Sequence, residues 1–343
     1  MKKNELQSWV DFFVDRGLSE VQINKYIPYI DALLKKGVPI IFEKQHLSHL
    51  IGINENTLNK IINNPEKFYR KFNIKKKRGG EREISSPYPS LLMCQKWIYK
   101  NILLKDNPHD SCHGFTPKRS IITNAKIHIN QKAILKLDLK DFFPSIPINW
   151  VIKYFQSLGY ANNVAYYLAA ICSFEKKLAQ GASTSPYISN LLLKNLDGRL
   201  SSLSQKYKIR YSRYADDMCF SGEKISQNFI KIAKEIITDS GLTINEDKTS
   251  LLINANKRII TGISVKGKTI TVPREFKRNI KNELHFISKF GYLSHINHQK
   301  IKDPNYLLRL IGRVNFWMQV EPNNSDAKKA LNMLNKINKN EIS

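Results

Sequence analysis

The sequence predicts an α+β fold, in which short strands are embedded among helices. Apolar residues recur at helical spacing along most of the 343-residue chain, and short β-rich runs interrupt them without a regular strand–helix alternation. The hydrophobic content of 42% is enough for a buried core. The length indicates two or three substructures rather than one small module.

The first 68 residues are expected to form short amphipathic helices. Leu6, Val10 and Phe13, for example, share one helical face. Between residues 46 and 62 the apolar spacing mimics a helix-turn-helix. The same spacing serves any helical hairpin, so we favour two packed helices over a DNA-reading unit.

Strands begin at Tyr69. The basic run 75–78, followed by Gly79 and Gly80, predicts a β-hairpin with a cationic tip, because two glycines permit positive φ; the alternative is a solvated loop. Further strands are expected over residues 133–139, 209–214 and 218–221, and a second hairpin over 258–272 with its turn at Lys266 and Gly267. Helices are expected over 88–104, 116–127, 147–158, 162–174, 186–207 and 224–240, and again from Arg274 onward.

The charge balance points to a polyanionic partner. Lys and Arg number 55 against 29 Asp and Glu, a formal net charge of +26, which favours nucleic acid over an anionic membrane surface. No run reaches the roughly 20 apolar residues that span a bilayer. The four cysteines form no Cys-x-x-Cys pair, which argues against a zinc site or disulfides. We therefore expect a cytoplasmic protein without membrane association.

Three carboxylates depart from this basic background. Asp216 and Asp217 fall between two β-rich runs, and Asp138 ends an apolar strand whose Leu135 and Leu137 alternate toward the core. Asp is a common turn former, so the pair alone has an ordinary structural explanation. An acidic residue that ends a buried strand needs a metal or a cationic partner. Three such groups on neighbouring strands suit two Mg²⁺ ions about 3.5–4 Å apart, the arrangement used for phosphoryl transfer.

Several motifs resemble the sequence blocks of reverse transcriptases. The segment 214–217, Tyr-Ala-Asp-Asp, resembles their Tyr-x-Asp-Asp hairpin, and residues 137–146 resemble the palm strand that carries the first catalytic Asp. Residues 180–186, Gln-Gly-Ala-Ser-Thr-Ser-Pro, resemble the loop that follows. Other blocks match at Gly241, Leu242, Asn245, Lys248 and Thr249 and, earlier, at Arg82, Ile84 and Pro87. The blocks keep the family's order between residues 69 and 273.

Within this family, the motifs are most similar to those of retron-type bacterial reverse transcriptases. Asn124, Ala125 and His128 reproduce their Asn-Ala-x-x-His element, whereas their Val-Thr-Gly occurs here as Ile-Thr-Gly at 260–262. Ala179 stands where the family commonly has a proline before the Gln-Gly pair. The resemblance implies a right-hand polymerase fold with fingers, a palm of antiparallel sheet plus helices, and a short helical thumb. It implies an N-terminal helical extension at 1–68, interleaved fingers and palm at 69–271, and a basic thumb at 272–343.

Carried over residue by residue, the resemblance implies that Asp138, Asp216 and Asp217 are catalytic and bind two Mg²⁺ ions. It implies dNTP contacts by Arg82, Arg78, Phe143, Gln180 and Lys248, with Phe143 excluding a ribose 2′-hydroxyl. The alternatives are packing of Phe143 beside Phe142, and a surface pairing of Lys248 with Glu246 or Asp247.

The resemblance also assigns RNA binding to Asn124, His128, Thr261 and Gly262, although a lone His128 is more commonly a core residue. Residues 255–343 contain 17 Lys and Arg against 6 Asp and Glu, a surplus of 11. Within this segment Arg274, Lys277, Arg278 and Lys281 recur at three- to four-residue spacing. A helix would present them as one stripe that tracks phosphates.

The function implied is that of an RNA-directed DNA polymerase of a retron. Such an enzyme copies its cognate structured non-coding RNA into a branched RNA–DNA, the multicopy single-stranded DNA, in an antiphage system with a separate effector protein. Two alternatives remain at this point. One is a reverse transcriptase of another bacterial lineage, group II intron-like or of the abortive-infection type. The other is a non-catalytic RNA-binding scaffold with a polymerase fold.

Overall fold

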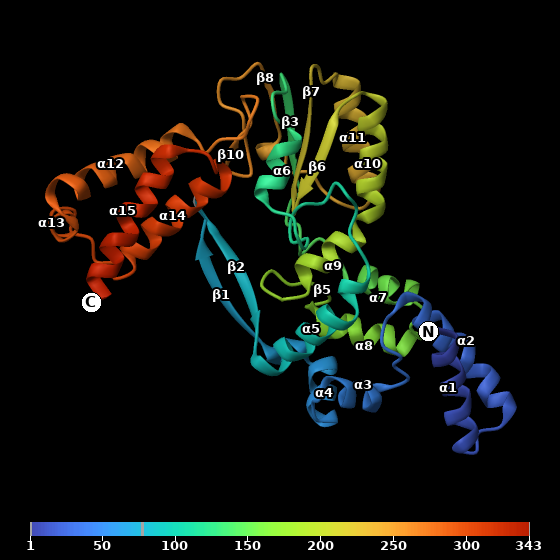
Figure 1. Cartoon of the computed structure of the whole chain (residues 1–343). Coiled ribbons are helices and arrows are strands. Elements are labelled where there is room, and N and C mark those ends of the chain that lie inside the picture. Colours follow the sequence, from blue (N-terminus) through green and yellow to red (C-terminus); the bar gives the residue numbers. More distant parts are fainter. Residues whose placement is uncertain (1, 77–78, 343) are drawn as a thin grey trace.

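The computed structural model describes residues 2–76 and 79–342 (Figure 1). Helices form the N-terminal part: α1 (Lys2–Asp15), α2 (Glu20–Lys36), α3 (Lys44–Ile51), α4 (Glu55–Asn63) and the 3₁₀ turn η1 (Pro65–Phe68). Ser19 and Gln22 form a capping box at the start of α2, and Gly37, with φ of 69°, ends it. The helices α3 and α4 pack against each other across Gly52, which confirms the prediction of two packed helices over residues 46–62.

A two-stranded hairpin follows. Strand β1 (Tyr69–Lys75) pairs antiparallel with β2 (Glu81–Pro87), from Tyr69 opposite Pro87 to Lys75 opposite Glu81. Most of its side chains are exposed, so the hairpin projects from the body of the protein (Figure 1). The prediction of a hairpin is confirmed here, while residues 77 and 78 of its tip lie outside the described residues.

A four-stranded antiparallel sheet forms the centre of the protein, in the order β6 (Arg210–Tyr214), β7 (Asp217–Gly222), β3 (Ala133–Asp138) and β8 (Ser250–Ile253). The elements that surround it are α5 (Pro89–Asn101), η2 (Leu103–Lys105), α6 (Ile121–Ile127), α7 (Ile148–Ser157), α8 (Asn162–Cys172), β4 (Ser173–Phe174), β5 (Lys177–Leu178), α9 (Ser185–Leu192), α10 (Lys194–Lys206), α11 (Gln227–Asp239) and η3 (Glu246–Lys248). The α+β prediction is therefore confirmed.

Two helices differ most from their predicted bounds. The helix predicted from residue 116 begins at Ile121, because Ser120 caps it with its hydroxyl. The helix predicted over 186–207 is divided at Leu193 into α9 and α10. Backbone hydrogen bonds from Leu193 N to Ser189 O and from Asp197 N to Leu193 O carry the chain across this bend.

The two faces of the sheet belong to different cores. Leu135, Leu137 and Phe220 pack into the larger core with helices α7 to α11. Ile134 and Cys219 point the other way, into a second core that includes Ala125 of α6 and the C-terminal helices. This division follows from the two-residue period of strands. Polar side chains that lie inside the protein beside these strands are therefore buried on one face or the other.

The C-terminal part starts with a short hairpin, β9 (Ile259–Ile260) and β10 (Ile263–Ser264). The helices that follow are α12 (Arg274–Phe290), α13 (Tyr292–His298), α14 (Tyr306–Val320) and α15 (Ser325–Ile342). The hairpin turns at Thr261 and Gly262, both at positive φ, and not at Lys266 and Gly267 as predicted. Only one bridge, Ser264 with Thr271, forms across the predicted turn. Among the described residues, no helix is both long enough and apolar enough to cross a bilayer.

Candidate active site

The three predicted carboxylates meet at one corner of the central sheet. Asp138 ends β3 and lies directly opposite Asp217, the first residue of β7. Tyr214 also pairs with Asp217, so Ala215 and Asp216 form a two-residue turn. Ala215 adopts a φ of 57°, the left-handed conformation that such tight hairpin turns require. The sequence prediction of neighbouring carboxylates is therefore confirmed in position.

Burial and mutual repulsion disfavour the charged forms of two carboxyl groups in this cluster, Asp216 and Asp217. Desolvation, reinforced by the negative charges of Asp216 and Asp138, raises the pKa of Asp217 to about 6. The same causes, burial first and the charge of Asp138 next, raise the pKa of Asp216. Three carboxylates in mutual repulsion are a site that a cation would stabilise.

One cation of the protein already reaches the cluster. The Nζ of Lys248 lies 2.8 Å from Oδ1 of Asp138, and this hydrogen bond raises the pKa of Lys248. Asn245 fixes the same carboxyl group with its side-chain amide, at 3.3 Å. Glu246 instead pairs with Lys234, at 2.7 Å. Lys248 therefore belongs to the carboxylate cluster, which removes the alternative of a surface pair with Glu246.

The donor set fits a hard divalent ion. Carboxylate oxygens are the ligands that Mg²⁺ accepts while substrate phosphates complete its coordination shell. Within the described ranges, no group of three or more His, Cys, Asp or Glu residues is arranged to hold a metal ion by itself. The arrangement matches a centre that is completed by substrate and not a closed structural site.

The predicted nucleotide-binding residues surround the corner to different degrees. The positive charge of Arg82, an exposed residue of β2, opposes in small part the rise in the pKa of Asp216 that burial causes. The Phe143 ring lies 5.2 Å from Phe142 and 6.4 Å from Phe115. Phe142 is buried, whereas Phe143 is only half-buried, so packing accounts for the first ring more fully than for the second. Arg78 lies outside the described residues.

The loop that carries Gln180 is fastened to the exposed hairpin. The backbone carbonyl of Gln180 accepts a hydrogen bond from Ser85 N at 2.8 Å. Gly181 has a φ of 125°, and a Cβ there would lie 2.6 Å from Ser85 O, so no other residue fits this close approach. Gln180 itself is half-buried.

Sequence reasoning missed Gln95, which holds this loop in place. Its side chain is fully buried in α5, accepts from Ser183 N at 3.1 Å, and donates to Tyr69 OH at 2.8 Å. It thereby joins the loop after Gln180 to the base of the hairpin. The available signal was a glutamine on the apolar face of α5, beside Leu91 and Ile98.

The placement of Asn124 and His128 contradicts the expectation that they bind RNA directly. Both are buried, 1% and 0% exposed. His128 contacts Ser221 Oγ through Nδ1 at 2.6 Å and Ser212 Oγ through Nε2 at 2.7 Å. Ser212 donates to Asn124 Oδ1 at 2.6 Å, and Asn124 Nδ2 donates to Thr261 Oγ1 at 3.4 Å. We call these five residues the His128 chain.

The direction of the His128 chain fixes the state of the imidazole. Ser212 gives its only proton to Asn124, so it must accept from His128 Nε2–H. A neutral ring then accepts at Nδ1 from Ser221. Burial, with the charge of Arg210 as a smaller cause, lowers the pKa of His128 to about 3, in keeping with the neutral form. Thr261 is held in its turn by the same chain, whereas Gly262 is exposed.

The predicted basic stripe on α12 is partly used inside the protein. Lys277 Nζ lies 2.8 Å from Glu321, and Lys281 Nζ lies 2.6 Å from Asp326. Lys277 is turned toward Trp317 and the helical core. Arg274 and Arg278 are exposed, and no ion pair is found for them in the described part of the chain. The ion pair of Lys277 with Glu321 is thus partly buried, whereas that of Lys281 with Asp326 lies at the surface.

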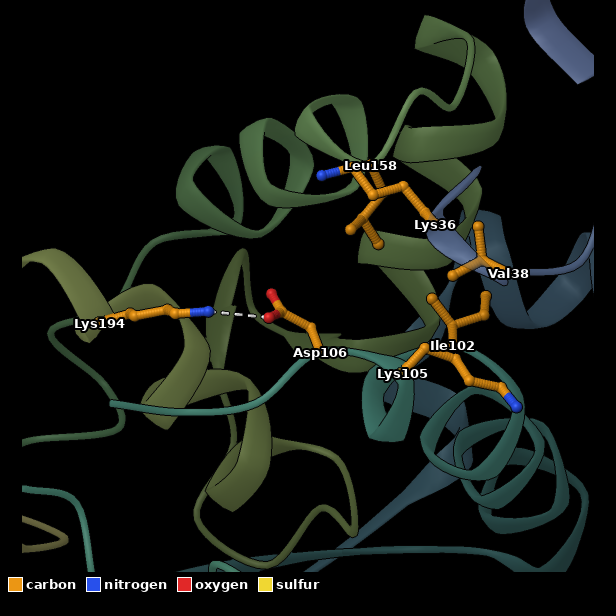
Figure 2. Close-up of a pocket in the computed structure, with 7 residues that line it drawn as sticks. All are labelled: Lys36, Val38, Ile102, Lys105, Asp106, Leu158 and Lys194. Atoms are coloured by element: carbon orange, nitrogen blue, oxygen red, sulfur yellow. Dashed lines mark hydrogen bonds and ion pairs between the residues drawn. The ribbon is translucent and has the colours of Figure 1, made fainter. Parts of the chain in front are cut away.

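A small pocket of about 190 Å³ lies elsewhere, among α2, η2, the end of α7 and the start of α10. Figure 2 shows Lys194 reaching Asp106, at 2.9 Å, with Val38, Ile102 and Leu158 on the other walls. None of the predicted site residues lines it. The carboxylate corner is thus separate from this pocket.

Comparison with known proteins agrees with the fold. A family model described as reverse transcriptase (RNA-dependent DNA polymerase) matches residues 74–287. The chain belongs to this family and is an RNA-directed DNA polymerase. It is 33% identical over 271 residues to the Retron Ec86 reverse transcriptase of Escherichia coli, covering 76% of this chain and 83% of that one. The chain is of the retron type, acts on RNA, and belongs to a family that uses divalent metal ions.

Two further matches show lower identity. The Retron Mx65 reverse transcriptase of Myxococcus xanthus is 30% identical over 277 residues, covering 74% of this chain and 65% of its own length. Among solved structures, a Candida albicans telomerase in complex with a fragment of telomeric RNA aligns with a TM-score of 0.46 and 12% identity, covering 78% of this chain and 63% of that one.

Proposed function

We propose that this enzyme copies the cognate structured non-coding RNA of its retron into DNA that stays linked to the RNA, giving a branched product with multicopy single-stranded DNA. The observation that carries the proposal is the corner of the sheet where Asp138 pairs with Asp217 and Asp216 occupies the turn. We assign residues 1–68 to a helical extension, 69–271 to fingers and palm, and 272–343 to a thumb. Within this extension Phe13, Ile23 and Ile30 form a separate apolar cluster, whereas later residues such as Leu47 and Leu58 pack into the larger core.

In this proposal Asp138, Asp216 and Asp217 hold two Mg²⁺ ions. When bound, the ions supply positive charge at the attacking primer hydroxyl and at the leaving pyrophosphate. Asn245 orients the carboxyl group of Asp138 from the side. The Lys248 ammonium, held 2.8 Å from Asp138, is placed to steady the charge of pyrophosphate or to give it a proton.

The remaining residues bind and select the nucleotide. Arg82, together with Arg78, makes charge-assisted hydrogen bonds to the triphosphate. The half-buried ring of Phe143 lies beside the sugar and excludes a 2′-hydroxyl, so the enzyme prefers dNTPs to rNTPs. The Gln180 side chain supports the incoming nucleotide from the loop that Gly181 and Ser85 fasten.

The nucleic acids are bound by exposed positive charge on the thumb. Arg274 and Arg278 stand one helical turn apart on α12, and Lys281 continues the same surface. Gly262, at the exposed turn before α12, is placed to contact the RNA backbone closely. We further propose a cytoplasmic location and a part in antiphage defence with a separate effector protein. The retron names of the relatives support the lineage on which this last proposal rests.

The test is to purify the protein with the non-coding RNA encoded beside it, add dNTPs and Mg²⁺, and analyse the product for RNA-linked DNA. We expect labelled DNA that changes mobility after RNase treatment. The double variant Asp216→Asn with Asp217→Asn should yield no DNA, because neither carboxylate of the turn remains. Asp247→Asn, which removes an exposed carboxylate of η3, is the matched control and should retain activity.

Each outcome bears on a different part of the proposal. Undiminished synthesis by the double Asp variant would exclude the assigned metal ligands. Synthesis on any primed template, but none on the adjacent RNA, would leave a polymerase and remove the retron substrate. RNA binding without nucleotide incorporation on any template would favour the scaffold alternative.

A further inference from the structure

A second polar cluster lies beneath the catalytic turn, on the opposite face of the sheet from the His128 chain. Arg213 of β6 and Asp197 of α10 form an ion pair with both side chains 0% exposed. The contact is bidentate, with Arg213 Nε 2.8 Å from Oδ1 and Nη2 2.6 Å from Oδ2. Tyr211 donates its hydroxyl to the same carboxylate at 2.7 Å.

The remaining guanidinium nitrogen of Arg213, Nη1, contacts the turn formed by Ala215 and Asp216. Nη1 donates to the carbonyl oxygen of Ala215 at 3.0 Å and to Asn190 Oδ1 at 3.2 Å. The Ala215 carbonyl belongs to the peptide unit that joins Ala215 to Asp216. The orientation of this peptide decides where the Asp216 side chain starts, and Ala215 holds it with an unfavourable φ of 57°.

A close approach from the other side confines the same turn. A Cβ on Gly114 would lie 2.5 Å from Ala215 N, so the backbone at Gly114 is packed directly against the turn. Asn190 donates to Gly114 O at 2.7 Å while accepting from Arg213. The turn is therefore held between Gly114 and the Arg213 guanidinium, and Asn190 ties these two supports together.

The chemistry of the pair is more specific than stability requires. Burying two charges is an inefficient way to stabilise a core, because apolar side chains of similar volume serve as well. A planar guanidinium, however, can serve a carboxylate on one edge and two oxygens on another, which a lysine ammonium on its flexible stem does not reproduce. The feature that an apolar core would lose is the bond to the Ala215 carbonyl.

We propose that Arg213, oriented by Asp197 and Asn190, is a positioning residue for the polymerase reaction. It fixes the Ala215–Asp216 peptide and thereby the distance of the Asp216 carboxylate from Asp138 and Asp217. The inference rests on the proposed role of Asp216 in metal binding. Loss of the guanidinium arm should weaken Mg²⁺ use and turnover, while primer–template binding stays as it is.

The decisive variant replaces the whole buried cluster with apolar groups: Arg213→Met, Asp197→Leu and Tyr211→Phe together. This change leaves no uncompensated buried charge. Initial rates of dTTP addition to poly(rA)·oligo(dT) are measured against Mg²⁺ and against primer–template concentration. We expect a folded protein with kcat reduced at least 100-fold, half-saturating Mg²⁺ raised about tenfold, and an unchanged KM for primer–template.

The thumb contains a matched control. Arg313 Nη1 lies 2.7 Å from Glu283, and Tyr306 donates to the same carboxylate at 2.9 Å. The corresponding triple variant, Arg313→Met, Glu283→Leu and Tyr306→Phe, should keep the wild-type Mg²⁺ dependence. Arg213→Lys is the second test, since it retains the pair's charge and removes the planar fork; we expect it to need more Mg²⁺ than the wild type.

A folded Arg213 triple variant with wild-type kcat and Mg²⁺ dependence would overturn the proposal. If that variant does not fold, a wild-type Mg²⁺ profile in Arg213→Lys would overturn it equally. Asp216→Asn is assayed in parallel, so that the metal-binding role of Asp216 and the positioning role of Arg213 are tested separately. Full activity of Asp216→Asn refutes the metal-ligand assignment, whereas an inactive Asp216→Asn beside a normal Arg213 variant refutes only the positioning role.

Discussion

The buried neutral His128 makes the stability of the enzyme depend on pH in a calculable way. In the folded protein its pKa is lowered to about 3, whereas an unfolded histidine has a pKa of about 6.5. Between these values the unfolded chain binds a proton that the folded chain does not. The contribution to stability is therefore complete above pH 6.5 and is lost progressively as the pH falls toward 3.

Linkage gives about 1.4 kcal/mol for each pH unit in that window, so the loss between pH 6.5 and pH 5 is about 2 kcal/mol. His128→Gln removes this proton uptake and keeps an amide N–H to donate to Ser212. The free energy of unfolding, measured by urea titration with EDTA at pH 8 and pH 5, should therefore fall by about 2 kcal/mol more in the wild type than in His128→Gln.

The comparison of the two proteins also removes the contribution of His113, a buried histidine whose pKa is lowered to about 4 in the same direction. His285→Gln, at an exposed position of α12, should behave as the wild type. Equal losses of stability in wild type and His128→Gln between pH 8 and pH 5 would refute the neutral, doubly bonded imidazole and the direction of the His128 chain.

Three further predictions concern the carboxylate cluster of Asp138, Asp216 and Asp217 and the residues around it. Gly114→Ala should lower single-nucleotide extension at least 100-fold, because its Cβ would lie 2.5 Å from Ala215 N, whereas Gly198→Ala meets nothing within 4 Å and should be silent in the same assay. Phe143→Ala should increase rNTP incorporation at least tenfold in gel-based extension with a single nucleotide. Unchanged sugar selectivity would show that this ring only packs beside Phe142. Mg²⁺ should raise the melting temperature more at pH 8 than at pH 5, since Asp217 has a pKa of about 6 and protonation competes with the ion, and a shift of the same size at both values would contradict this.

The parts of the site that could be predicted from the sequence are those that produce a local sequence pattern. Strand alternation placed Asp138 at the end of an apolar strand, and the turn between two β-rich runs carried Asp216 and Asp217. Both signals depend on neighbouring residues only. That the two segments meet, as β3 and β7 do, was expected from the resemblance to the reverse transcriptase blocks and not from local pattern.

The supports of the site depend on contacts between distant segments. Arg213 and Asp197 are 16 residues apart, and each alone reads as an ordinary exposed charge, because burial of an ion pair leaves no periodic signal. The misplaced turn has a similar cause. A β-branched Thr at positive φ is unfavourable by local rules, and Thr261 adopts it where its hydroxyl bonds to Ile121 O and receives the Asn124 amide.

The same contrast changes how the retron-typing residues are understood. Asn124 and His128 serve the interior, since their hydrogen bonds run from β7 through β6 and α6 to the turn before the thumb. Because adjacent residues of β6 face opposite ways, Ser212 is held by this chain while Arg213 is held by Asp197. The hairpin that carries Asp216 and Asp217 is thus fixed from both faces by polar networks whose partners are buried. The proposed catalytic role of these carboxylates would require such rigidity. Under the proposed function, exposed groups such as Gly262 and Arg278 are the candidates for discrimination among RNAs. We expect substitutions there, unlike those in the His128 chain, to change RNA choice without changing stability.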